Sequence, residues 1–341
     1  MRVVIATKSR GSVAVWRWPD SATARLRAEF PEVKFVEYLG PSDTAPATPQ
    51  EQAAAGAVFA AAEAVVAWQL DPALLAAAPR LRWIHSPAAA VNQLLSPELI
   101  ARPIAVTNAA SVHATIVAEH TAALLLALAR GLPAAIRQQA EGRWDIAAWP
   151  ESVAAVAGTS ALLLGMGHIG RALAVRLAAF EIQVIGVRRR PPDADAALPP
   201  GCTALHTLAD LPRLLPAADW VILALPNTAE TQSVIGASEL ALMRPSAHLL
   251  SVGRGAALDE AALARALASG RLAGAGLDVF RHEPLPADSP LWRSPRVLIT
   301  PHVGASSPGA WDRQVELLGR HLARFLSGAT PEPLVDKRLG Y

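Results

Sequence analysis

The sequence predicts an α/β protein built from two doubly wound parallel sheets. Short runs rich in β-branched residues alternate with alanine-rich helical stretches in both halves of the chain. This alternation is typical of a parallel sheet covered by helices on both faces. The 341 residues are also sufficient for two domains that each bury a core.

In the first half, apolar runs bounded by turn residues predict short buried strands. These strands cover Arg2–Thr7, Val33–Tyr38, Ala64–Trp68, Arg82–Ser86 and Ile104–Asn108. The stretch between Leu39 and Pro49 is rich in Pro, Ser and Thr, which predicts a loop. A long helix is predicted from Ser111 to Ala129, and Gly131–Pro133 ends it.

The second half repeats this pattern, with a glycine-rich turn after its first strand. Its predicted strands are Ala161–Leu164, Gln183–Val187, Trp220–Ala224, His248–Val252, Gly274–Asp278 and Val297–Thr300. Helices are predicted from the glycine turn to Phe180, over Glu260–Ser269 and over Ala310–Leu326. A proline-rich break is predicted at Pro191–Pro200.

Composition excludes several classes of protein. The chain is 52% hydrophobic and 18% charged, which is a globular balance, and its net charge of +2 gives no argument for nucleic-acid binding. Cys202 is the single cysteine, so no intrachain disulfide can form. The apolar run Ala122–Ala129 is too short to span a membrane, and the first residues lack a signal-peptide run. We therefore expect a cytoplasmic protein without a metal site.

The glycine motif Gly165-Met-Gly167-His168-Ile169-Gly170 follows a strand and opens a helix, as in Rossmann dinucleotide sites. Gly165 would permit the tight turn, Gly167 would let the backbone approach a pyrophosphate, and Gly170 would allow close packing of the helix. The helix amino terminus, with His168 and Ile169, would offer free N–H groups to the phosphates. The alternative is a strand–helix turn without a ligand.

The second strand of this unit ends at Val187, and Arg188-Arg189-Arg190 follow it, where an NAD site would place an acid. Guanidinium groups bind a 2′-phosphate through charge-assisted hydrogen bonds, whereas a carboxylate would repel it. Arg188 and Arg189 therefore favour NADP(H), with NAD(H) as a second cofactor. The alternative is a solvated basic loop.

Three later motifs carry a specific family resemblance. They are Ser251-Val-Gly-Arg254-Gly, Gly276-Leu-Asp278-Val-Phe-Arg-His-Glu283-Pro and Thr300-Pro-His302-Val-Gly. Together with Leu225-Pro-Asn-Thr, Pro290-Leu-Trp292, Trp83–Asn108 and Val117-Ala-Glu119, they resemble the D-isomer-specific 2-hydroxyacid dehydrogenases over nearly the whole chain. The resemblance is closest to the NADPH-preferring subgroup that reduces glyoxylate, hydroxypyruvate and bulkier 2-oxo acids.

The resemblance implies hydride transfer between nicotinamide C4 and C2 of a 2-oxo acid. Arg254 would bind the substrate carboxylate and carbonyl, and His302 would act as general acid and base. Glu283 would accept a hydrogen bond from the other imidazole nitrogen and favour the imidazolium. The remaining implied contacts are Asp278, Val252 and Gly253 to the nicotinamide, and the backbone amides of Ala89 and Ala90 to the substrate carboxylate.

The residues alone leave other interpretations open. His302 could be a structural histidine, Arg254 a turn residue, and Glu283-Pro284 a helix cap. The family usually has Gly-Val-Asp where this chain has Ala90-Val91-Asn92, which puts the identity of the substrate in doubt.

The same resemblance predicts the domain organisation. A smaller flavodoxin-like substrate domain would comprise residues 1–108 and 300–341, and a Rossmann cofactor domain would be inserted at residues 109–299. Crossings near Asn108 and Thr300 would form a hinge. A homodimer would form through the cofactor domains, with the helix from Ser111 and the segment Trp144–Trp149 as candidate interface. The alternative is that these aromatic residues belong to the core.

Two other functions share parts of this pattern. A nucleotide-sensing, corepressor-like interaction protein could use the same scaffold, because fold alone does not settle function. A methyltransferase would use only the glycine turn and would leave Arg254, Glu283 and His302 unexplained.

Overall fold

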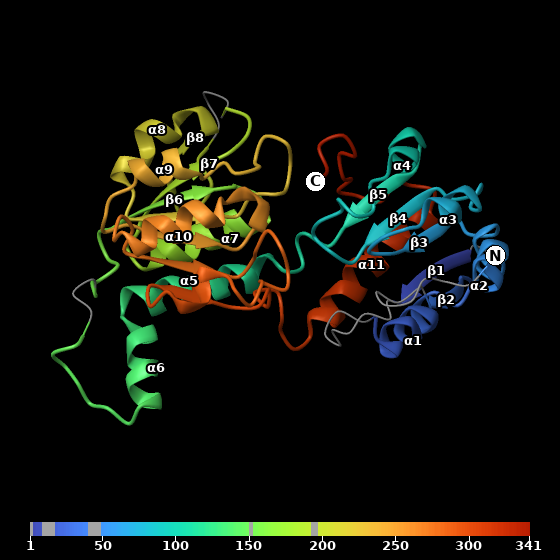
Figure 1. Cartoon of the computed structure of the whole chain (residues 1–341). Coiled ribbons are helices and arrows are strands. Elements are labelled where there is room, and N and C mark those ends of the chain that lie inside the picture. Colours follow the sequence, from blue (N-terminus) through green and yellow to red (C-terminus); the bar gives the residue numbers. More distant parts are fainter. Residues whose placement is uncertain (1–2, 9–17, 40–48, 150–152, 192–196) are drawn as a thin grey trace. The chain divides into compact units, whose positions relative to one another are not determined.

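The structure is a computed structural model that describes residues 3–8, 18–39, 49–149, 153–191 and 197–341 (Figure 1). The chain divides into two compact units, Met1–His113 with Ser306–Tyr341 (unit 1) and Ala114–Ala305 (unit 2). Both crossings lie a few residues beyond the predicted ones, so His302 belongs to unit 2 and not to the carboxy-terminal segment of unit 1. The predicted loop between Leu39 and Pro49, and part of the break at Pro191–Pro200, lie outside the described residues.

Unit 1 contains a five-stranded parallel sheet in the order β2-β1-β3-β4-β5, which is the flavodoxin-like order. The strands are β1 (Val3–Lys8), β2 (Lys34–Leu39), β3 (Ala64–Val66), β4 (Trp83–Ser86) and β5 (Ala105–Asn108). The helices are α1 (Asp20–Glu29), α2 (Pro49–Phe59), α3 (Pro72–Ala76), α4 (Pro97–Ala101) and α11 (Ala310–Leu326).

The last helix, α11, completes the core of unit 1. Its apolar residues recur at helical spacing, and Val315, Leu318, Leu322 and Phe325 are all buried. They pack in one cluster with Leu26 of α1 and Trp83 of β4. The carboxy-terminal segment is therefore an integral part of this unit, as the sequence predicted.

Unit 2 contains a seven-stranded parallel sheet in the order β12-β11-β10-β9-β6-β7-β8, a Rossmann order extended by one strand. The strands are β6 (Ser160–Leu164), β7 (Gln183–Val187), β8 (Cys202–His206), β9 (Trp220–Leu223), β10 (His248–Ser251), β11 (Gly274–Leu277) and β12 (Val297–Ile299). The helices are α5 (Ala114–Ala129), α6 (Leu132–Ala140), α7 (His168–Ala179), α8 (Leu211–Leu214), α9 (Ala237–Leu242) and α10 (Glu260–Ala268).

Both faces of this sheet are apolar and buried. Along β6, Ala161 and Leu163 join a cluster with α5 and α7, while Leu162 and Leu164 join a cluster with α8, α9 and α10. Successive side chains of a strand point to opposite faces, so the two clusters are the two faces of the sheet. Helices on both sides confirm the doubly wound prediction.

Three predicted details were wrong. Helix α5 begins at Ala114, because residues 110–113 form a turn in which the N–H of Val112 donates to the carbonyl of Ala109. Gly131, at φ 66°, ends α5 as expected, but Pro133 then lies in the first turn of a further helix, α6. Strand β8 was missed, because only the five-residue run Cys202–His206 follows the proline-rich break.

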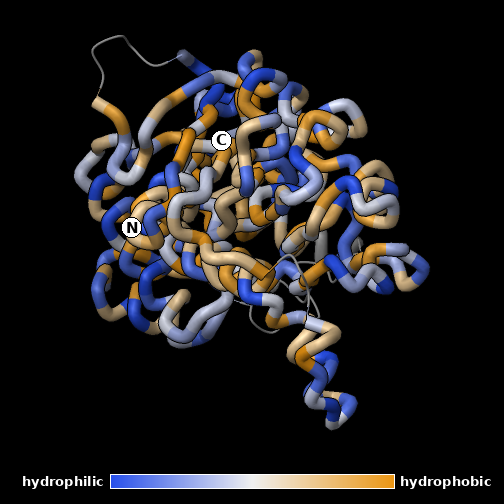
Figure 2. Tube along the Cα trace, turned by 90° about the vertical axis from the view of Figure 1, so that its left-hand side faces the viewer, coloured by the Kyte–Doolittle hydropathy of each residue, from blue (hydrophilic) through white to orange (hydrophobic). Residues whose placement is uncertain are grey.

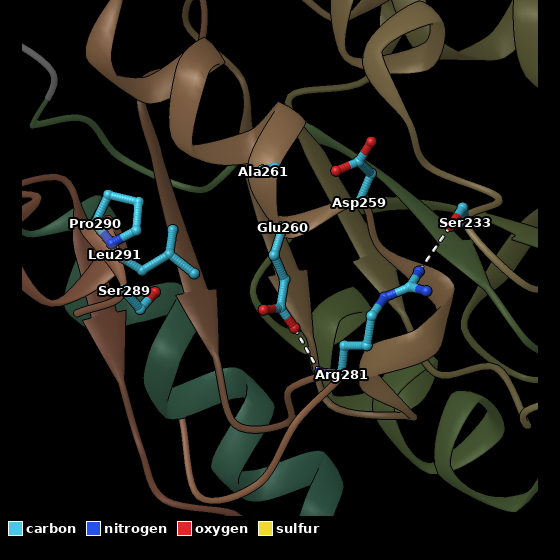
Figure 3. A pocket seen from close by; sticks show the side chains of 8 residues that line it. All are labelled: Ser233, Asp259, Glu260, Ala261, Arg281, Ser289, Pro290 and Leu291. Carbon is cyan, nitrogen blue, oxygen red and sulfur yellow. Dashed lines mark hydrogen bonds between the residues drawn. The ribbon is translucent and has the colours of Figure 1, made fainter. Parts of the chain in front are cut away.

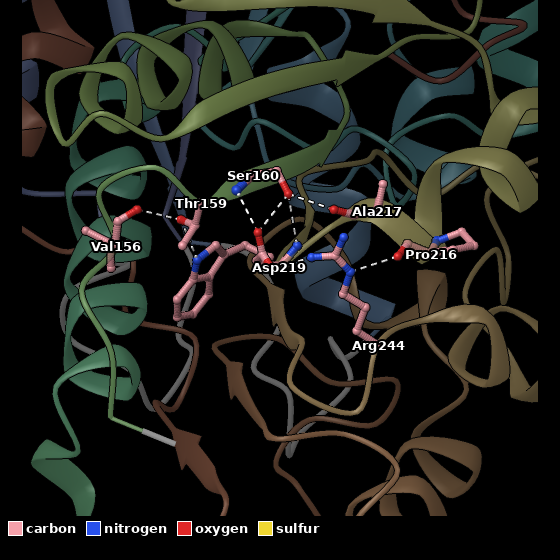
Figure 4. Close-up of polar contacts among 8 residues, drawn as sticks. Val156, Thr159, Ser160, Pro216, Ala217, Asp219 and Arg244 are labelled. Atoms are coloured by element: carbon pink, nitrogen blue, oxygen red, sulfur yellow. Dashed lines mark hydrogen bonds and ion pairs between the residues drawn. The ribbon is translucent and has the colours of Figure 1, made fainter. Parts of the chain in front are cut away.

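The amino-terminal edge of the unit 2 sheet is held by a polar network (Figure 4). Asp219 accepts hydrogen bonds from the backbone N–H and the hydroxyl of Ser160, both at 2.9 Å. Arg244 binds the other oxygen of Asp219 and donates to the carbonyl of Pro216. This network ties β6 to the start of β9, at the edge opposite the glycine turn.

No single helix among the described residues is long and apolar enough to cross a membrane. Helices α5 and α6 meet that length and composition only as a pair, bent by 73° at their junction.

Candidate active site

The glycine turn lies at the carboxyl end of β6, where the strand order of unit 2 reverses. Gly165 has φ 107°, and a side chain there would overlap the carbonyl oxygen of Ala224. A side chain at Gly170 would overlap the carbonyl oxygen of Gly165. The first and third glycines are therefore required by the tightness of the turn itself.

Gly167 has a more open environment than the other two glycines, and this bears on whether a dinucleotide fits here. A Cβ at Gly167 would meet no atom within 4 Å, so the backbone faces open space. Gly167 is also the N-cap of α7, and no side chain caps the helix there. His168 is exposed and Ile169 half-buried at this helix end. An uncapped helix amino terminus with an exposed backbone fits the pyrophosphate of a dinucleotide.

The arginines after β7 are already engaged with other groups. Arg188 donates through Nε to the carbonyl of Arg190 at 2.7 Å and through Nη2 to the carbonyl of Pro191 at 3.0 Å. Arg189 pairs with Glu230 at 2.8 Å, and both side chains are largely exposed. A phosphate bound here would compete with the Glu230 carboxylate for the donors of Arg189.

The segment after β10 is packed closely onto its neighbours. The N–H groups of Val252 and Gly253 both donate to the carbonyl of Leu223 at 3.0 Å. A Cβ on Gly253 would lie 2.6 Å from the carbonyl oxygen of Leu225. A Cβ on Gly255 would overlap the backbone of Phe280. The two glycines that flank Arg254 therefore place it between the loops that follow β9 and β11.

Arg254 and Glu283 interact electrostatically. Burial lowers the pKa of the Arg254 guanidinium, whereas the negative charge of Glu283 raises it. An arginine retains its charge under such a shift. Burial alone would raise the pKa of Glu283, but hydrogen bonds from His302 and the N–H of Phe280 and the charges of His302 and Arg254 lower it. Glu283 is therefore held as a carboxylate.

His302 and Glu283 form a close pair at the carboxyl edge of the sheet. The Nδ1 atom of His302 lies 2.6 Å from Oε2 of Glu283, and Oε1 of Glu283 accepts the N–H of Phe280 at 2.9 Å. The side chains of His302 and Glu283 are 42% and 35% exposed, so the imidazole remains accessible. Because a carboxylate only accepts, the Nδ1 atom of His302 carries the proton in this contact.

Asp278, the first residue after β11, is buried and accepts several hydrogen bonds. Its Oδ1 accepts the hydroxyl of Thr300 at 2.6 Å and the N–H of Val303 at 3.0 Å, and its Oδ2 accepts the N–H of Gly304 at 3.0 Å. Burial would raise the pKa of Asp278, but these bonds and one from His120 lower it to about 2. A carboxylate oxygen can accept two hydrogen bonds, so Oδ2 retains capacity for a nicotinamide amide.

A surface cavity of about 480 Å³ lies beside this edge (Figure 3). Arg281 lines it and donates to the hydroxyl of Ser233 at 2.8 Å, while its own N–H donates to Glu260. A second bond from Arg281 reaches the carbonyl of Ala256 at 3.4 Å. Arg281 thus connects the loop after β9 to the segment that follows Arg254.

The predicted substrate amides lie in unit 1, in the loop after β4. The side chain of Asn108 donates to the carbonyl of Ala89 at 2.9 Å, and Gln314 donates to the carbonyl of Pro87. Within the described part of the chain, the N–H groups of Ala89 and Ala90 have no acceptor. Both residues are half-buried, so these amides are available to a ligand.

Sequence reasoning missed four residues around the site. They are His120, Thr300, Gly304 and Glu230, which contact Asp278 or Arg189. Thr300 and Gly304 lie in the motif quoted for His302, and His120 is a polar residue in an otherwise apolar helix. Glu230 is distant in sequence from Arg189 and gave no signal. In the part of the chain that the structure describes, no three His, Cys, Asp or Glu side chains gather as metal ligands.

The fold and site define a dinucleotide-dependent α/β oxidoreductase. The sequence pattern of the D-isomer specific 2-hydroxyacid dehydrogenase family, NAD binding domain, matches residues 122–304. The chain is 33% identical over 275 residues to a glyoxylate reductase of Korarchaeum cryptofilum, covering 79% of this chain and 80% of that protein. It is 35% identical over 277 residues to a glyoxylate reductase of Thermococcus gammatolerans, covering 80% and 81%.

Solved structures show the same likeness. An NADPH-dependent glyoxylate/hydroxypyruvate reductase of Sinorhizobium meliloti is 29% identical, with a TM-score of 0.77 and coverage of 99% of this chain and 98% of that one. A D-isomer specific 2-hydroxyacid dehydrogenase of Xanthobacter autotrophicus, solved with NADPH, is 27% identical, with a TM-score of 0.79 and coverage of 100% and 99%.

The chain therefore belongs to the D-isomer specific 2-hydroxyacid dehydrogenase family. It is an oxidoreductase that interconverts the CH–OH group of small 2-hydroxy acids and the C=O group of 2-oxo acids, with hydride transfer to or from NAD(P). The relatives named above are enzymes, so the corepressor-like and methyltransferase alternatives gain no support from them.

Proposed function

We propose that the protein is an NADP(H)-preferring reductase that converts glyoxylate to glycolate, or hydroxypyruvate and similar 2-oxo acids to D-2-hydroxy acids. The observation that carries this proposal is the 2.6 Å contact between His302 and Glu283, in the same unit as Arg254 and the glycine turn. The NADPH bound to the Xanthobacter relative and the arginines after β7 support the choice of cofactor.

The two charged groups have separate tasks in this proposal. Arg254 binds the substrate carboxylate and polarises the carbonyl oxygen, for which its planar fork of donors is suited. The cofactor supplies the hydride that adds to C2. His302 donates the Nε2 proton to the carbonyl oxygen, and Glu283 keeps the proton on Nδ1 and offsets the imidazolium charge. In the reverse direction, neutral His302 removes the hydroxyl proton.

Backbone amides would also bind the substrate carboxylate. The free N–H groups of Ala89 and Ala90 are the groups expected to bind it. Asp278, Val252 and Gly253 would surround the nicotinamide, and Gly165, Gly167, His168, Ile169 and Gly170 would hold the pyrophosphate. Arg188 and Arg189 would bind the 2′-phosphate once Glu230 releases Arg189.

Steady-state kinetics test the proposal directly. Purified protein is assayed with glyoxylate, hydroxypyruvate and bulkier 2-oxo acids, each with NADPH and with NADH, and the chirality of the product is determined. We expect NADPH to give the higher kcat/KM. The products from hydroxypyruvate and the bulkier 2-oxo acids should be D-isomers, whereas glycolate, formed from glyoxylate, has no stereocentre. Absence of 2-oxo acid reduction with both cofactors would contradict the proposed activity.

We also propose a homodimer formed through unit 2. Helix α6 projects from the body of this unit (Figures 1 and 2), and large apolar side chains on it and in the following segment are exposed. They are Leu132, Ile136, Trp144, Ile146 and Trp149, with Trp144 90% exposed. Exposed apolar patches of this kind mark association surfaces. Sedimentation equilibrium should give twice the chain mass, and Trp144→Arg should shift the equilibrium to monomer.

A further inference from the structure

A second histidine, His120 of α5, contacts the segment that carries His302. Its Nε2 atom lies 3.0 Å from the hydroxyl of Thr300 and 3.5 Å from Oδ1 of Asp278. The side chain of His120 is 21% exposed and that of Asp278 only 3%. The sequence pattern assigns this histidine no role.

The directions of these hydrogen bonds follow from a count of donors. A threonine hydroxyl has one proton, and the 2.6 Å contact shows that Thr300 donates it to the carboxylate of Asp278. The contact between Thr300 and His120 therefore needs the proton of the imidazole. His120 is protonated on Nε2, and it donates to the group that itself donates to Asp278.

Gly304 provides an independent sign that this arrangement is closely packed. A Cβ at Gly304 would lie 2.7 Å from Oδ2 of Asp278 and 3.2 Å from Cδ2 of His120. Non-bonded contacts of a Cβ as short as the first of these distances are essentially never found in proteins. The turn after His302 therefore lies directly against both the carboxylate and the second imidazole.

His302 needs such support because its own backbone is unfavourable. It has φ 53°, in the left-handed region that non-glycine residues rarely adopt. Its N–H donates to the carbonyls of Asp278 at 2.9 Å and Thr300 at 3.0 Å. A conformation of this kind persists only where the surrounding contacts over-determine it. The N–H groups of Val303 and Gly304, held by the carboxylate of Asp278, supply the rest of that constraint.

We infer that His120 is a positioning residue for His302, acting through Thr300 and Asp278. It fixes the Thr300 hydroxyl and the Asp278 carboxylate, and these hold the turn from Thr300 to Gly304 in the conformation that directs the imidazole of His302. The inference rests on the proposed function for its kinetic consequence, since His302 must be the proton donor for its orientation to affect the rate.

The test uses two pairs of variants. His120→Phe removes the donor, while His120→Gln places an amide N–H near the former Nε2. Thr300→Val removes the bridging hydroxyl from the other side, while Thr300→Ser retains it. The matched control is Thr121→Val, because Thr121 is buried in the same helix and its hydroxyl donates only to the carbonyl of Val117, at 2.6 Å.

We expect His120→Phe and Thr300→Val to lower kcat by about 10- to 100-fold, the order of loss caused by an ångström-scale misplacement of a reacting group. The Kd for NADPH should change less than kcat, because the contact at Asp278 is disturbed while the glycine turn expected to hold the pyrophosphate is not. His120→Gln and Thr300→Ser should recover most of the lost kcat, and Thr121→Val should match the wild type. Equal kcat in wild type, His120→Phe and Thr300→Val would overturn the inference.

Hydrogen–deuterium exchange separates this inference from the proposed function. The amides of Val303 and Gly304 should exchange faster in His120→Phe than in the wild type or in Thr121→Val. If the wild type reduces no 2-oxo acid but this exchange difference is present, the proposed function fails and the positioning contact stands. If the wild type is active and exchange in the turn is unchanged in both loss variants, the positioning role fails alone.

Discussion

The Nδ1 atom of His302 donates a hydrogen bond to Oε2 of Glu283 over 2.6 Å, although both side chains are more than a third exposed. Solvent screening makes such a pair a weak contributor to stability. The pair instead fixes a proton on Nδ1, and in the proposed function Nε2 would then exchange a proton with the substrate. The first two predictions test these two consequences.

Replacing His302 by Ala should remove the proton donor and leave the cofactor site intact. General acid–base catalysis contributes about 10²–10⁴-fold to rate, so kcat should fall by that order. The Kd for NADPH, measured by fluorescence titration, should be unchanged. A variant that keeps more than half of the wild-type kcat, while hydride transfer limits the rate, would show that another group supplies the proton.

Glu283→Gln should alter the pH dependence of reduction. Glu283 is held as a carboxylate, since its pKa is lowered by His302 and by Arg254 despite burial. Glutamine removes the negative charge that faces the Nδ1 atom of His302. The basic limb of the kcat/KM profile should therefore move to lower pH. An unmoved profile with reduced kcat would mean that Glu283 only orients the ring.

The fold was largely predictable because both units follow one simple alternation of strands and helices. The glycine turn, the strand Gln183–Val187 and the helix Ala310–Leu326 were all predicted within a residue of their observed bounds. Strand β8 was not, because its five residues are only partly buried and show no long apolar run. Helix α6 is not predicted, because Gly131–Pro133 indicates the end of a helix and gives no sign that a second one begins there.

The site was predictable only in part, for a physical reason. The residue types themselves indicate the chemistry proposed for Arg254, Glu283 and His302. The supporting contacts depend on tertiary packing, as with His120, which lies 180 positions before Thr300, and Glu230, which lies 41 after Arg189. No local sequence pattern indicates such pairs. The Ala90 and Asn92 departures likewise leave the substrate to be found by assay.

Acid should destabilise unit 1 through a buried histidine. Burial, and then the charge of nearby His321, lowers the pKa of His85 to about 3 from its ordinary value of 6.5. Because the folded-state pKa is lowered, His85 binds a proton in the unfolded chain at pH values where it is neutral in the folded chain. This contribution is complete above pH 6.5 and is lost progressively as pH falls toward 3.

His85→Asn isolates this effect, since asparagine does not titrate and places its side-chain amide near the former Nδ1, which lies 2.9 Å from the hydroxyl of Thr107. The unfolding free energy, measured by urea titration, should fall less steeply with acid in the variant, by at most about 1.4 kcal/mol per pH unit for one proton. Parallel slopes in variant and wild type between pH 6.5 and 4.5 would exclude His85 as a source of acid sensitivity.

Cofactor choice should depend on the arginines after β7. Replacing both Arg188 and Arg189 by Ala should weaken NADPH binding by about 10- to 100-fold, since hydrogen bonds to charged groups contribute roughly 1.5–3 kcal/mol each. NADH binding should change little. Raising the ionic strength should reduce the wild-type preference for NADPH, because salt screens the attraction between the arginines and the phosphate. Equal loss for both cofactors would mean that the arginines shape the loop through their bonds to Arg190 and Pro191.

Glu230 gives the sharper test, because it competes with the 2′-phosphate for Arg189. Glu230→Gln removes a carboxylate that pairs with Arg189 at 2.8 Å, so it should remove one competitor for the guanidinium and tighten NADPH binding. Exposed ion pairs contribute about 0.2–1 kcal/mol, which corresponds to a decrease in Kd of up to about fivefold. The matched control is Glu119→Gln, which breaks the similar 2.9 Å pair with Arg176. If both variants change the Kd for NADPH equally, the effect is a general change in charge and Arg189 does not read the phosphate.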